Sequence, residues 1–311
     1  MTLLSPAPST PSHAVQWVSS AGQRLGLVPG LGGGVAAWQL ERPEQPPLDL
    51  WRPWDGSNTD MYSLASFAMV PWTNRISGGG FEQDGRFHAV ALNRPSEPYP
   101  IHGDGWLQPW DWRQPAPDIL EMTLESHRFG GDPYDYSALQ RFQLLDGGMD
   151  QTVTVTHLGD SPLPYGIGLH PWYLRSANTR LQADVSGIWL CGDDPIPTTH
   201  THGFPPSWDL RQGLDVNGTL IDNAFTGWSG RSSISWPEHQ LTLTMRVPQV
   251  EEAGGDGFCL LYRPPVGSAF CFEPVTHPID AFHLPGRPGL MVLGPRESLS
   301  LHVQWRFESG P

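Results

Sequence analysis

The dominant pattern along the chain is an alternation of apolar and polar residues with a period of two. In residues 298–307, SLSLHVQWRF, every second side chain from Leu299 to Phe307 is apolar. Such alternation is typical of a strand that turns one face to a core and the other to water. The same pattern recurs in residues 118–127, 151–158 and 239–247. The chain is therefore predicted to be rich in half-buried strands.

Glycine-rich stretches between these strands predict turns. Asp146-Gly147-Gly148 separates two apolar runs and predicts a β-hairpin. The run of glycines in residues 26–38, GLVPGLGGGVAAW, is not a dinucleotide-binding fingerprint, because Val35 occupies the last glycine position and a strand follows. We expect a tight turn between two strands there.

Helical periodicity is nearly absent, and residues 60–69, DMYSLASFAM, are one short helix candidate. Strands and turn signals continue from about residue 15 to the end without a linker or a clear repeat. The predicted fold is all-β: one large antiparallel β-sandwich over residues 15–311, preceded by a flexible tail over residues 1–14. An immunoglobulin-type array is disfavoured because the Cys…Trp…Cys spacing is missing.

Composition excludes several classes of function. The net charge is −14, which disfavours a nucleic-acid partner, because phosphate backbones are bound by clustered basic residues. All 18 basic residues other than histidine are arginines. Without lysine, Schiff-base chemistry, pyridoxal phosphate anchoring and a P-loop are ruled out.

The three cysteines are interpreted as small buried hydrophobic residues in a reducing compartment. The N-terminal residues lack the basic and apolar regions of a signal peptide, and no apolar run is long enough to span a membrane. We therefore expect a cytoplasmic protein without a membrane partner.

One histidine pair is a candidate metal site by its spacing. His200 and His202 lie two residues apart in THTHG, residues 199–203, and on one strand they would share a face. The surrounding Pro, Thr and Asp residues predict a loop instead, and no third ligand lies nearby. We therefore predict no metal.

Two ionisable residues share a local design that favours catalysis. His170 in GIGLHPWY and Glu273 in FCFEPVTH each follow an apolar stretch and precede a proline. Because proline lacks the N–H that a ladder needs, each strand is expected to end there and to present its side chain at a sheet rim or cleft. Histidine and glutamate so held are a plausible acid and base. The many tryptophans offer flat apolar faces for a sugar ring.

At these residues the chain resembles the aldose 1-epimerase family, the galactose mutarotases and their relatives, from about residue 24 to 306. PWTNRISGGGF, IHGDGW, GIGLHPWY, TLIDNAFTGW and FCFEPVTHPIDAF follow one another in the family's order. The resemblance implies His170 as general acid and Glu273 as general base. It also implies Arg75, His102 and Asp222 as residues that bind sugar hydroxyls. His277 and His283 receive no role and are interpreted as structural.

The resemblance implies a galactose mutarotase-like supersandwich and an isomerase that interconverts the anomers of a free aldose without a cofactor. We expect a small-molecule sugar as partner and a monomer or weak homodimer. The sequence leaves open a hexose-6-phosphate 1-epimerase and a non-catalytic carbohydrate-binding protein on the same fold. A glycoside-processing enzyme would need a carboxylate pair, for which Asp222 and Glu273 are the available residues.

Overall fold

The computed structural model describes residues 13–309, so most of the predicted N-terminal tail lies outside the described residues. Strands dominate the described chain, and its one α-helix is α1 (Pro248–Glu252). Within the described residues, no helix combines the length and the apolar character that crossing a membrane requires. The prediction of an all-β fold with very little helix is confirmed.

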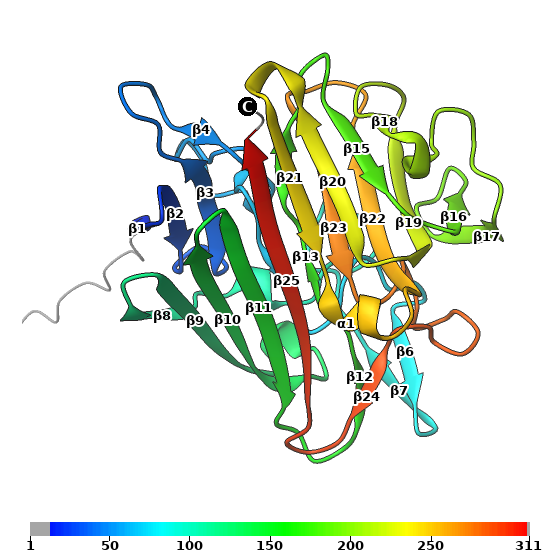
Figure 1. Ribbon diagram of the computed structural model, residues 1–311. Helices are drawn as coiled ribbons and strands as arrows, with labels where there is room; N and C mark the ends of the chain where they lie inside the picture. The colour runs from blue at the N-terminus through cyan, green and yellow to red at the C-terminus, as the bar shows by residue number, and fades with distance from the viewer. Residues whose placement is uncertain (1–12, 310–311) are drawn as a thin grey trace, which may run out of the picture.

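Two large sheets and one smaller sheet form the body of the molecule (Figure 1). The nine-stranded sheet has the order β18 (Leu214–Asp215), β15 (Arg180–Ala183), β20 (Arg231–Trp236), β21 (Leu241–Arg246), β25 (Ser298–Ser309), β11 (Gly148–His157), β10 (Asp135–Leu145), β9 (Ile119–His127) and β8 (Asp111–Ala116). The eight-stranded sheet has the order β17 (Pro197–Thr201), β16 (Gly187–Cys191), β19 (Ile221–Trp228), β22 (Gly257–Arg263), β23 (Ala269–Val275), β13 (Gly168–Leu169) and β5 (Ala68–Met69), with β14 (Trp172–Leu174) also paired to β23. The four-stranded sheet runs β1 (Gln16–Ser20), β2 (Gln23–Val28), β3 (Gly34–Leu40) and β4 (Leu48–Asp49).

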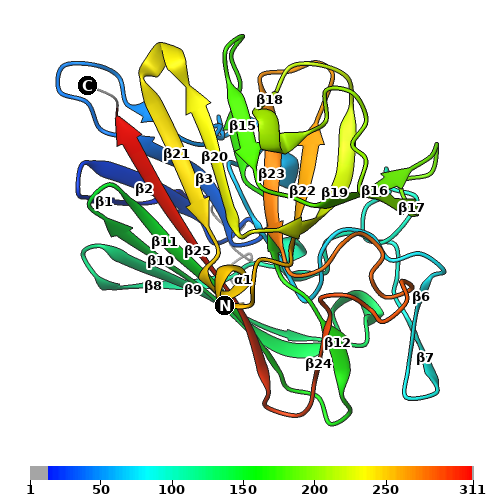
Figure 2. The ribbon, with the colours of Figure 1, turned by 45° about the vertical axis from the view of Figure 1, so that its right-hand side comes forward.

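Short elements complete the described chain. A hairpin pairs β6 (Gly80–Gln83) with β7 (Arg86–Ala89), and a separate two-stranded sheet pairs β12 (Leu163–Tyr165) with the distant β24 (Met291–Leu293). Single 3₁₀ turns occupy Met61–Ser63, Gly105–Leu107, Phe129–Gly131, Leu210–Gln212 and Pro237–His239. Figure 2 shows the C-terminal strand β25 (red) between β11 and β21, in the middle of the nine-stranded sheet.

The strands predicted from alternation are present. Residues 118–127, 151–158, 239–247 and 298–307 correspond to β9, β11, β21 and β25. The predicted hairpin joins β10 to β11, where Leu145 pairs with Gly148 across a two-residue turn. Gly147 in that turn has a φ of +69°, which glycine adopts without steric cost. Within the segment 26–38, residues 29–33 form a turn between β2 and β3, as predicted.

A tryptophan cluster ties the four-stranded sheet to the nine-stranded one. The ring of Trp51 lies edge-on between Trp38 of β3, at 5.2 Å, and Trp305 of β25, at 5.3 Å. Trp38 also donates to the side chain of Gln23, whose amide donates to the carbonyls at both ends of the β10–β11 turn. The buried amide of Gln23 is thereby satisfied, which removes the cost of burying it.

Strand β23 carries Glu273, and all seven of its residues are buried. Phe270 and Phe272 belong to the core cluster shared with the nine-stranded sheet, whereas Cys271 packs with Trp172 on the opposite face. Since side chains alternate along a strand, Glu273 shares the face of Cys271. That face turns away from the core between the sheets.

Three expectations about local structure are wrong. Residues 60–69 form a single 3₁₀ turn at Met61–Ser63 and a two-residue strand rather than a helix. Residues 199–201 belong to strand β17 rather than to a loop, because they pair with β16. Pro274 does not end its strand: it pairs with Cys259 of β22, and β23 continues to Val275. Glu273 therefore lies within a sheet face and not at a rim.

Candidate active site

A cavity of about 480 Å³ lies over the outer face of the eight-stranded sheet. The register of the strands places its floor. Asp222 of β19 pairs with Tyr262 of β22, and Leu260 of β22 pairs with Glu273 of β23. The cavity is lined by Tyr62, Asn74, Arg75, Arg94, Ser96, Glu97, Ile101, His102, His170, Trp172, Leu220, Asp222, Tyr262 and Glu273. The five residues singled out from the sequence therefore line one cavity.

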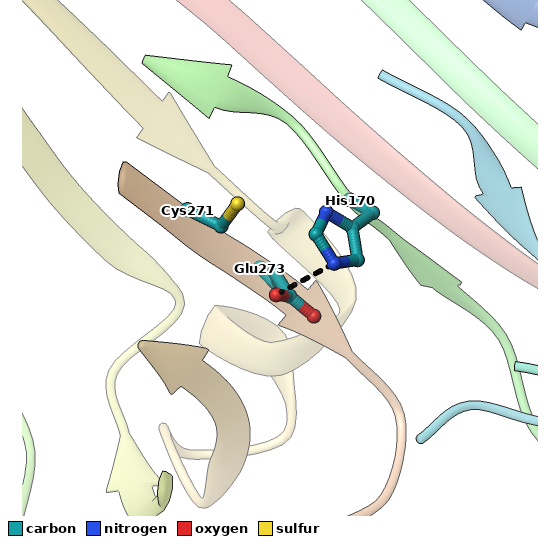
Figure 3. Close-up of side chains that lie close together, drawn as sticks. All are labelled: His170, Cys271 and Glu273. Atoms are coloured by element: carbon teal, nitrogen blue, oxygen red, sulfur yellow. Dashed lines mark ion pairs between the residues drawn. The ribbon is translucent and has the colours of Figure 1, made fainter. Parts of the chain in front are cut away.

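His170 and Glu273 face each other across a gap in the sheet. Gly168 of β13 pairs with Val275, and Trp172 of β14 pairs with Cys271. Continuing this register places His170 opposite Glu273, at the point where Pro171 separates β13 from β14. The Nε2 atom of His170 lies 3.4 Å from Oε1 of Glu273 (Figure 3). The proline after each residue supplies no N–H to the ladder, which leaves the gap in β13–β14 pairing.

Both side chains are almost completely buried, with 5% and 3% of their surface exposed. The His170 ring stacks on Phe67 at 4.7 Å and its backbone N–H donates to the Phe67 carbonyl. Burial lowers the pKa of His170 to about 3. Burial also raises the pKa of Glu273 well above its usual value, an effect that Asp222 reinforces and Arg75 opposes. The empty cavity thus favours the uncharged form of each residue.

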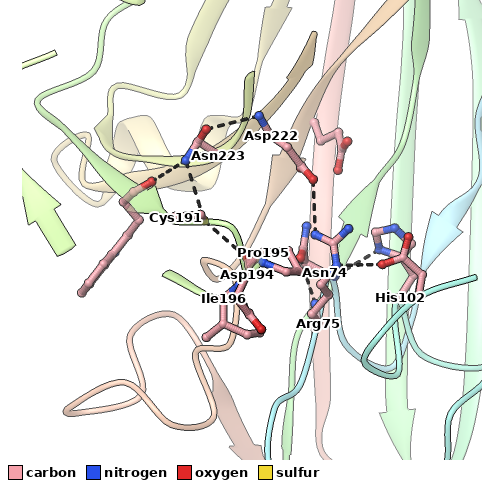
Figure 4. Close-up of polar contacts among 12 residues, drawn as sticks. Asn74, Arg75, His102, Cys191, Asp194, Pro195, Ile196, Asp222 and Asn223 are labelled. Atoms are coloured by element: carbon pink, nitrogen blue, oxygen red, sulfur yellow. Dashed lines mark hydrogen bonds and ion pairs between the residues drawn. The ribbon is translucent and has the colours of Figure 1, made fainter. Parts of the chain in front are cut away.

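Arg75 is held between two carboxylates, and Figure 4 shows its contact with Asp222. Its Nε donates to Glu97 at 2.9 Å, and its NH1 donates to Asp222 at 3.4 Å. Burial opposes the charged guanidinium, but Asp222 and Glu97 outweigh it and raise the pKa of Arg75. Burial raises the pKa of Asp222 although Arg75 opposes this shift. The rigid fork of the guanidinium is fixed in direction, and both carboxylates keep oxygens that can accept from a ligand.

His102 has a defined tautomer. The backbone N–H of Asn74 donates to its Nδ1 at 3.1 Å, and the His102 backbone N–H donates to the Asn74 carbonyl at 2.8 Å. Because Nδ1 accepts, the ring proton resides on Nε2, which can donate. Burial, with the nearby His170 and Arg75, lowers the pKa of His102 well below its usual value, so the ring is neutral. His102 is therefore built as a hydrogen-bond donor rather than as an ion.

Aromatic residues and a second arginine form the wall of the cavity. The Arg94 guanidinium lies over the ring of Tyr62 at 4.2 Å and pairs with the Asp60 carboxylate at 3.1 Å. Trp172 and Tyr262 meet edge to face at 5.8 Å on the sheet side. Flat aromatic faces beside polar groups suit a ligand with both apolar faces and hydroxyl edges.

Several lining residues were not singled out from the sequence. Glu97 lies in a proline-flanked coil, PSEPYP, with no periodic pattern, and only the tertiary fold brings it to Arg75. Tyr62 falls in the segment whose sequence predicts a short helix, and that pattern gives no sign that its side chain lines the cavity. Asn74 adjoins Arg75 in the motif PWTNR, and that adjacency was the available signal.

Histidines outside the cavity have structural partners. His277 is buried, its Nε2 accepts from the Thr73 N–H at 3.1 Å, and its Nδ1 lies 2.8 Å from the Pro278 carbonyl. His200 and His202 contact Thr226 and the Ser186 carbonyl. Among the described residues, the group with metal-ligand spacing is instead His170, Cys271 and Glu273.

Known proteins of one family match the chain. A family model described as aldose 1-epimerase matches residues 23–306. The uncharacterized protein YphB of Escherichia coli (strain K12) is 32% identical over 248 residues, covering 77% of this chain and 83% of that protein.

Solved structures show the same fold. A crystal structure from Escherichia coli K12, described as a candidate aldose 1-epimerase, superposes with a TM-score of 0.87 at 26% identity over 96% of this chain and 99% of that one. An aldose epimerase homologue from C. elegans has a TM-score of 0.78 at 15% identity over 96% and 100% of the two chains.

Proposed function

Because the chain belongs to the aldose 1-epimerase family, we propose that it interconverts the α and β anomers of a free aldose. The observation that carries this proposal is the contact between His170 and Glu273, 3.4 Å apart and buried at the floor of the cavity. An acid and a base at this separation can serve adjacent oxygens of one sugar, the ring oxygen and the anomeric hydroxyl.

In the proposed reaction, the Glu273 carboxylate takes the proton from the C1 hydroxyl while protonated His170 donates to the ring oxygen. The C1–O bond of the ring breaks and C1 becomes an aldehyde. Rotation about C1–C2 presents the other face of the carbonyl, and ring closure with reversed proton transfers yields the other anomer. Protons are exchanged between sugar and enzyme in equal number, and no electrons are lost or gained.

The pair needs one proton in total, and its position decides the reactivity. In the empty cavity burial favours that proton on Glu273, since the neutral forms are then both present. Hydrogen bonds from a bound sugar stabilise the carboxylate, so the proton moves to His170 within the pair. This transfer creates the acid and the base together without exchange of a proton with solvent.

Binding of the sugar is assigned to the groups around the pair. His102 can donate from Nε2 to a ring or hydroxyl oxygen, and Arg75 can donate to hydroxyl oxygens from its fixed fork. Asp222 and Glu97 accept from hydroxyls. Trp172 supplies an apolar face, which suits one side of a pyranose ring.

The test compares Glu273→Gln and His170→Asn with the wild type. Glu273→Gln keeps the size of the side chain and His170→Asn replaces the ring with a smaller polar group. In each variant the catalysed rate, after subtraction of the spontaneous rate, is expected to fall roughly 10²–10⁴-fold. Anomer exchange is measured by polarimetry or by NMR on glucose and galactose, and sugar binding by tryptophan fluorescence. Exchange at the wild-type rate in both variants contradicts the proposal.

Matched controls separate chemistry from folding. His283→Asn changes a histidine paired with Asp280 outside the cavity, and Glu121→Gln changes a buried carboxylate paired with Arg113 on the other sheet. Both control variants are expected to exchange anomers at the wild-type rate. All four variants are expected to unfold in a cooperative thermal transition. A wild-type protein that binds sugar without accelerating exchange is instead a carbohydrate-binding protein.

A further inference from the structure

A third reactive side chain lies against the His170–Glu273 pair. Cys271 precedes Glu273 by two residues on β23, so both side chains point to the same face of the sheet (Figure 3). One ligand atom from each of His170, Cys271 and Glu273 lies within 4.8 Å of the others. Cys271 does not line the cavity; its thiol lies beneath the floor, opposite Trp172 in the register.

The spacing matches the coordination of zinc. With Zn–N and Zn–O distances near 2.0–2.1 Å, a tetrahedral ion holds those two ligand atoms roughly 3.3–3.4 Å apart. The observed separation between His170 Nε2 and Glu273 Oε1 is 3.4 Å. A Zn–S bond of about 2.3 Å places the sulfur roughly 3.5 Å from the other two ligand atoms, so from a separation of up to 4.8 Å the thiol has to approach by at most roughly 1.3 Å. Rotation of the cysteine side chain supplies such a movement.

The buried polar atoms of this group have unused bonding capacity. Oε2 of Glu273 and Nδ1 of His170 have no hydrogen-bond partner within residues 13–309. Buried polar atoms are normally satisfied by protein, water or an ion. The floor of the cavity thus holds a carboxylate and an imidazole that each keep one atom without a protein partner among the described residues; zinc bound at Nε2 would leave Nδ1 of His170 in that state.

We propose that His170, Cys271 and Glu273 bind one zinc ion at the floor of the cavity, and that this ion blocks the site. A thiolate, a neutral imidazole and a carboxylate suit zinc. Magnesium and calcium bind such a set poorly, because they prefer oxygen ligands. The ion enters from the cavity, which offers its fourth position to water. With the thiolate and the carboxylate, the centre has no net charge, which makes its burial tolerable.

Binding has a defined proton balance and one electrostatic opponent. The S–H bond of Cys271 breaks, the Zn–S bond forms, and the proton leaves through the cavity to solvent; a proton on Glu273 leaves in the same way. Arg52 is the nearby positive charge that opposes the ion. Its guanidinium is turned to the ring of Trp172, at 4.2 Å, and donates to the Leu64 carbonyl at 2.9 Å.

Occupation by zinc uses both members of the acid–base pair. The lone pair of His170 and the carboxylate of Glu273 then bind metal and cannot move protons of a sugar. Zinc and sugar are therefore expected to exclude each other. This inhibitory consequence rests on the proposed function, whereas the metal site itself does not.

The test of the site uses cobalt as a visible probe for zinc. Titration of the metal-free full-length protein with Co²⁺ is expected to give a thiolate–cobalt charge-transfer band and strong visible bands of a tetrahedral ion, saturating at one equivalent. Zinc should displace the cobalt, and magnesium should not. Cys271→Ser is expected to abolish the charge-transfer band, with an affinity loss greater than the roughly 10–100-fold typical of an outer-sphere partner.

The other two thiols provide matched controls. Cys191→Ser changes a half-buried thiol near Asn223 and Cys259→Ser a fully buried one on β22; both variants should keep the band. Cys271→Ala serves as a second variant if Cys271→Ser lacks a cooperative thermal transition. A wild-type protein without the band, or a band that survives both substitutions of Cys271, overturns the proposal.

A second arm measures the consequence for the sugar site. Zinc is expected to raise the apparent KM for anomer exchange without changing kcat. The Cys271→Ser variant, compared with its own metal-free rate, is expected to need far more zinc for the same rise in KM. If the metal-free wild-type protein does not accelerate anomer exchange and still gives the cobalt band on titration, the proposed function fails and the metal site stands. A cobalt band whose ion leaves sugar binding and exchange unaltered would refute the blocking role.

Discussion

At the scale of single residues, the decisive feature is that His170 and Glu273 are buried together, 3.4 Å apart, and share one proton in the proposed reaction. A second proton is added only when the pH approaches about 3, the pKa to which burial lowers His170. The remaining proton is held to a higher pH than an ordinary glutamate would hold it, because burial raises the pKa of Glu273. The singly protonated pair, which is the reactive form in the proposed mechanism, is therefore expected to span a broad range of pH.

The pH profile of catalysed exchange should reflect this range. An unperturbed carboxylate base would lose half its activity near its usual pKa of about 4.3 as the pH falls. For the buried pair the acid limb is expected below that value, so catalysis at pH 4.5 should stay close to that at pH 6. The measurement is kcat/KM above the buffer-catalysed rate between pH 4.5 and 7, with folding checked at each pH. An ordinary carboxylate with a pKa of about 4.3 would lose about 40% of kcat/KM at pH 4.5 relative to pH 6, and a fall of this size or larger would contradict the expectation.

Glu97 provides a second residue-scale prediction. It fixes Arg75 through a 2.9 Å bond to Nε, and both residues line the cavity. In Glu97→Gln this charged contact is lost and the guanidinium is free to turn toward Asp222. We expect KM to rise roughly 10–100-fold, the equivalent of about 1.5–3 kcal/mol for a hydrogen bond to a charged group, with a smaller change in kcat.

The matched control is Glu121→Gln, which breaks a carboxylate–arginine pair between Glu121 of β9 and Arg113 of β8, outside the cavity. It should leave KM unchanged. An equal fall in kcat for Glu97→Gln at constant KM would mean that Glu97 acts in the chemical step rather than in binding.

At the scale of elements, the loop that carries His102 depends on the buried carboxylate of Asp104. Its Oδ2 accepts from Ser126 of β9 at 3.0 Å, and its Oδ1 accepts from Tyr136 of β10. The Asp104 N–H donates to the Val70 carbonyl at 3.1 Å. Burial raises the pKa of Asp104 to about 6 although both hydroxyl donors lower it. The loop is thus fixed to the nine-stranded sheet by a group that titrates near pH 6.

Stability should therefore fall as the pH rises through this window. The unfolded chain releases the Asp104 proton near pH 3.9, whereas the folded chain holds it to about pH 6, so the folded state binds more protons in between. A shift of this size corresponds to at most about 3 kcal/mol. In Asp104→Asn this contribution is absent, and the free energy of unfolding should decline less between pH 4 and 7. Urea melts of the two proteins at both pH values measure the difference, and parallel declines would contradict it.

The same scale separates what the sequence predicted from what it did not. Period-two alternation located β9, β11, β21 and β25, because burial of one face leaves that mark directly in the residue order. It failed at β17, whose five residues are largely exposed and carry no apolar face, and whose pairing with β16 decides its structure. The rule that proline ends a strand failed at Pro274, since β23 extends past it while the ladder on the β13–β14 side is interrupted.

The candidate site was predictable in its members and not in its geometry. Ordered motifs pointed to His170 and Glu273, and the structure brings them within 3.4 Å through the β13–β23–β14 register. Glu97 and Cys271 could not be found in this way. The contact of Glu97 depends on a coil packed over the sheet, and Cys271 resembles any buried small residue until its strand is paired.

At the scale of the whole molecule, the charge of the chain bears on the choice of substrate. The net charge is −14, and the cavity is lined by two arginines against the three carboxylates Glu97, Asp222 and Glu273. Each arginine is already paired, Arg75 with Glu97 and Asp222, and Arg94 with Asp60. A phosphate dianion needs unpaired donors and positive potential, which this arrangement does not offer.

Glucose should therefore be a better substrate than glucose 6-phosphate, and the difference should depend on salt. At low ionic strength the acidic molecule repels the phosphate over distances of roughly 30 Å, and at physiological salt over roughly 8 Å. Added salt is thus expected to raise kcat/KM for glucose 6-phosphate and to leave that for glucose nearly unchanged. Both sugars are followed by the same NMR exchange experiment at several concentrations of sodium chloride. If the phosphorylated sugar is preferred and its kcat/KM falls with salt, then the arginines exchange their carboxylate partners for phosphate, and the protein is a hexose-6-phosphate 1-epimerase.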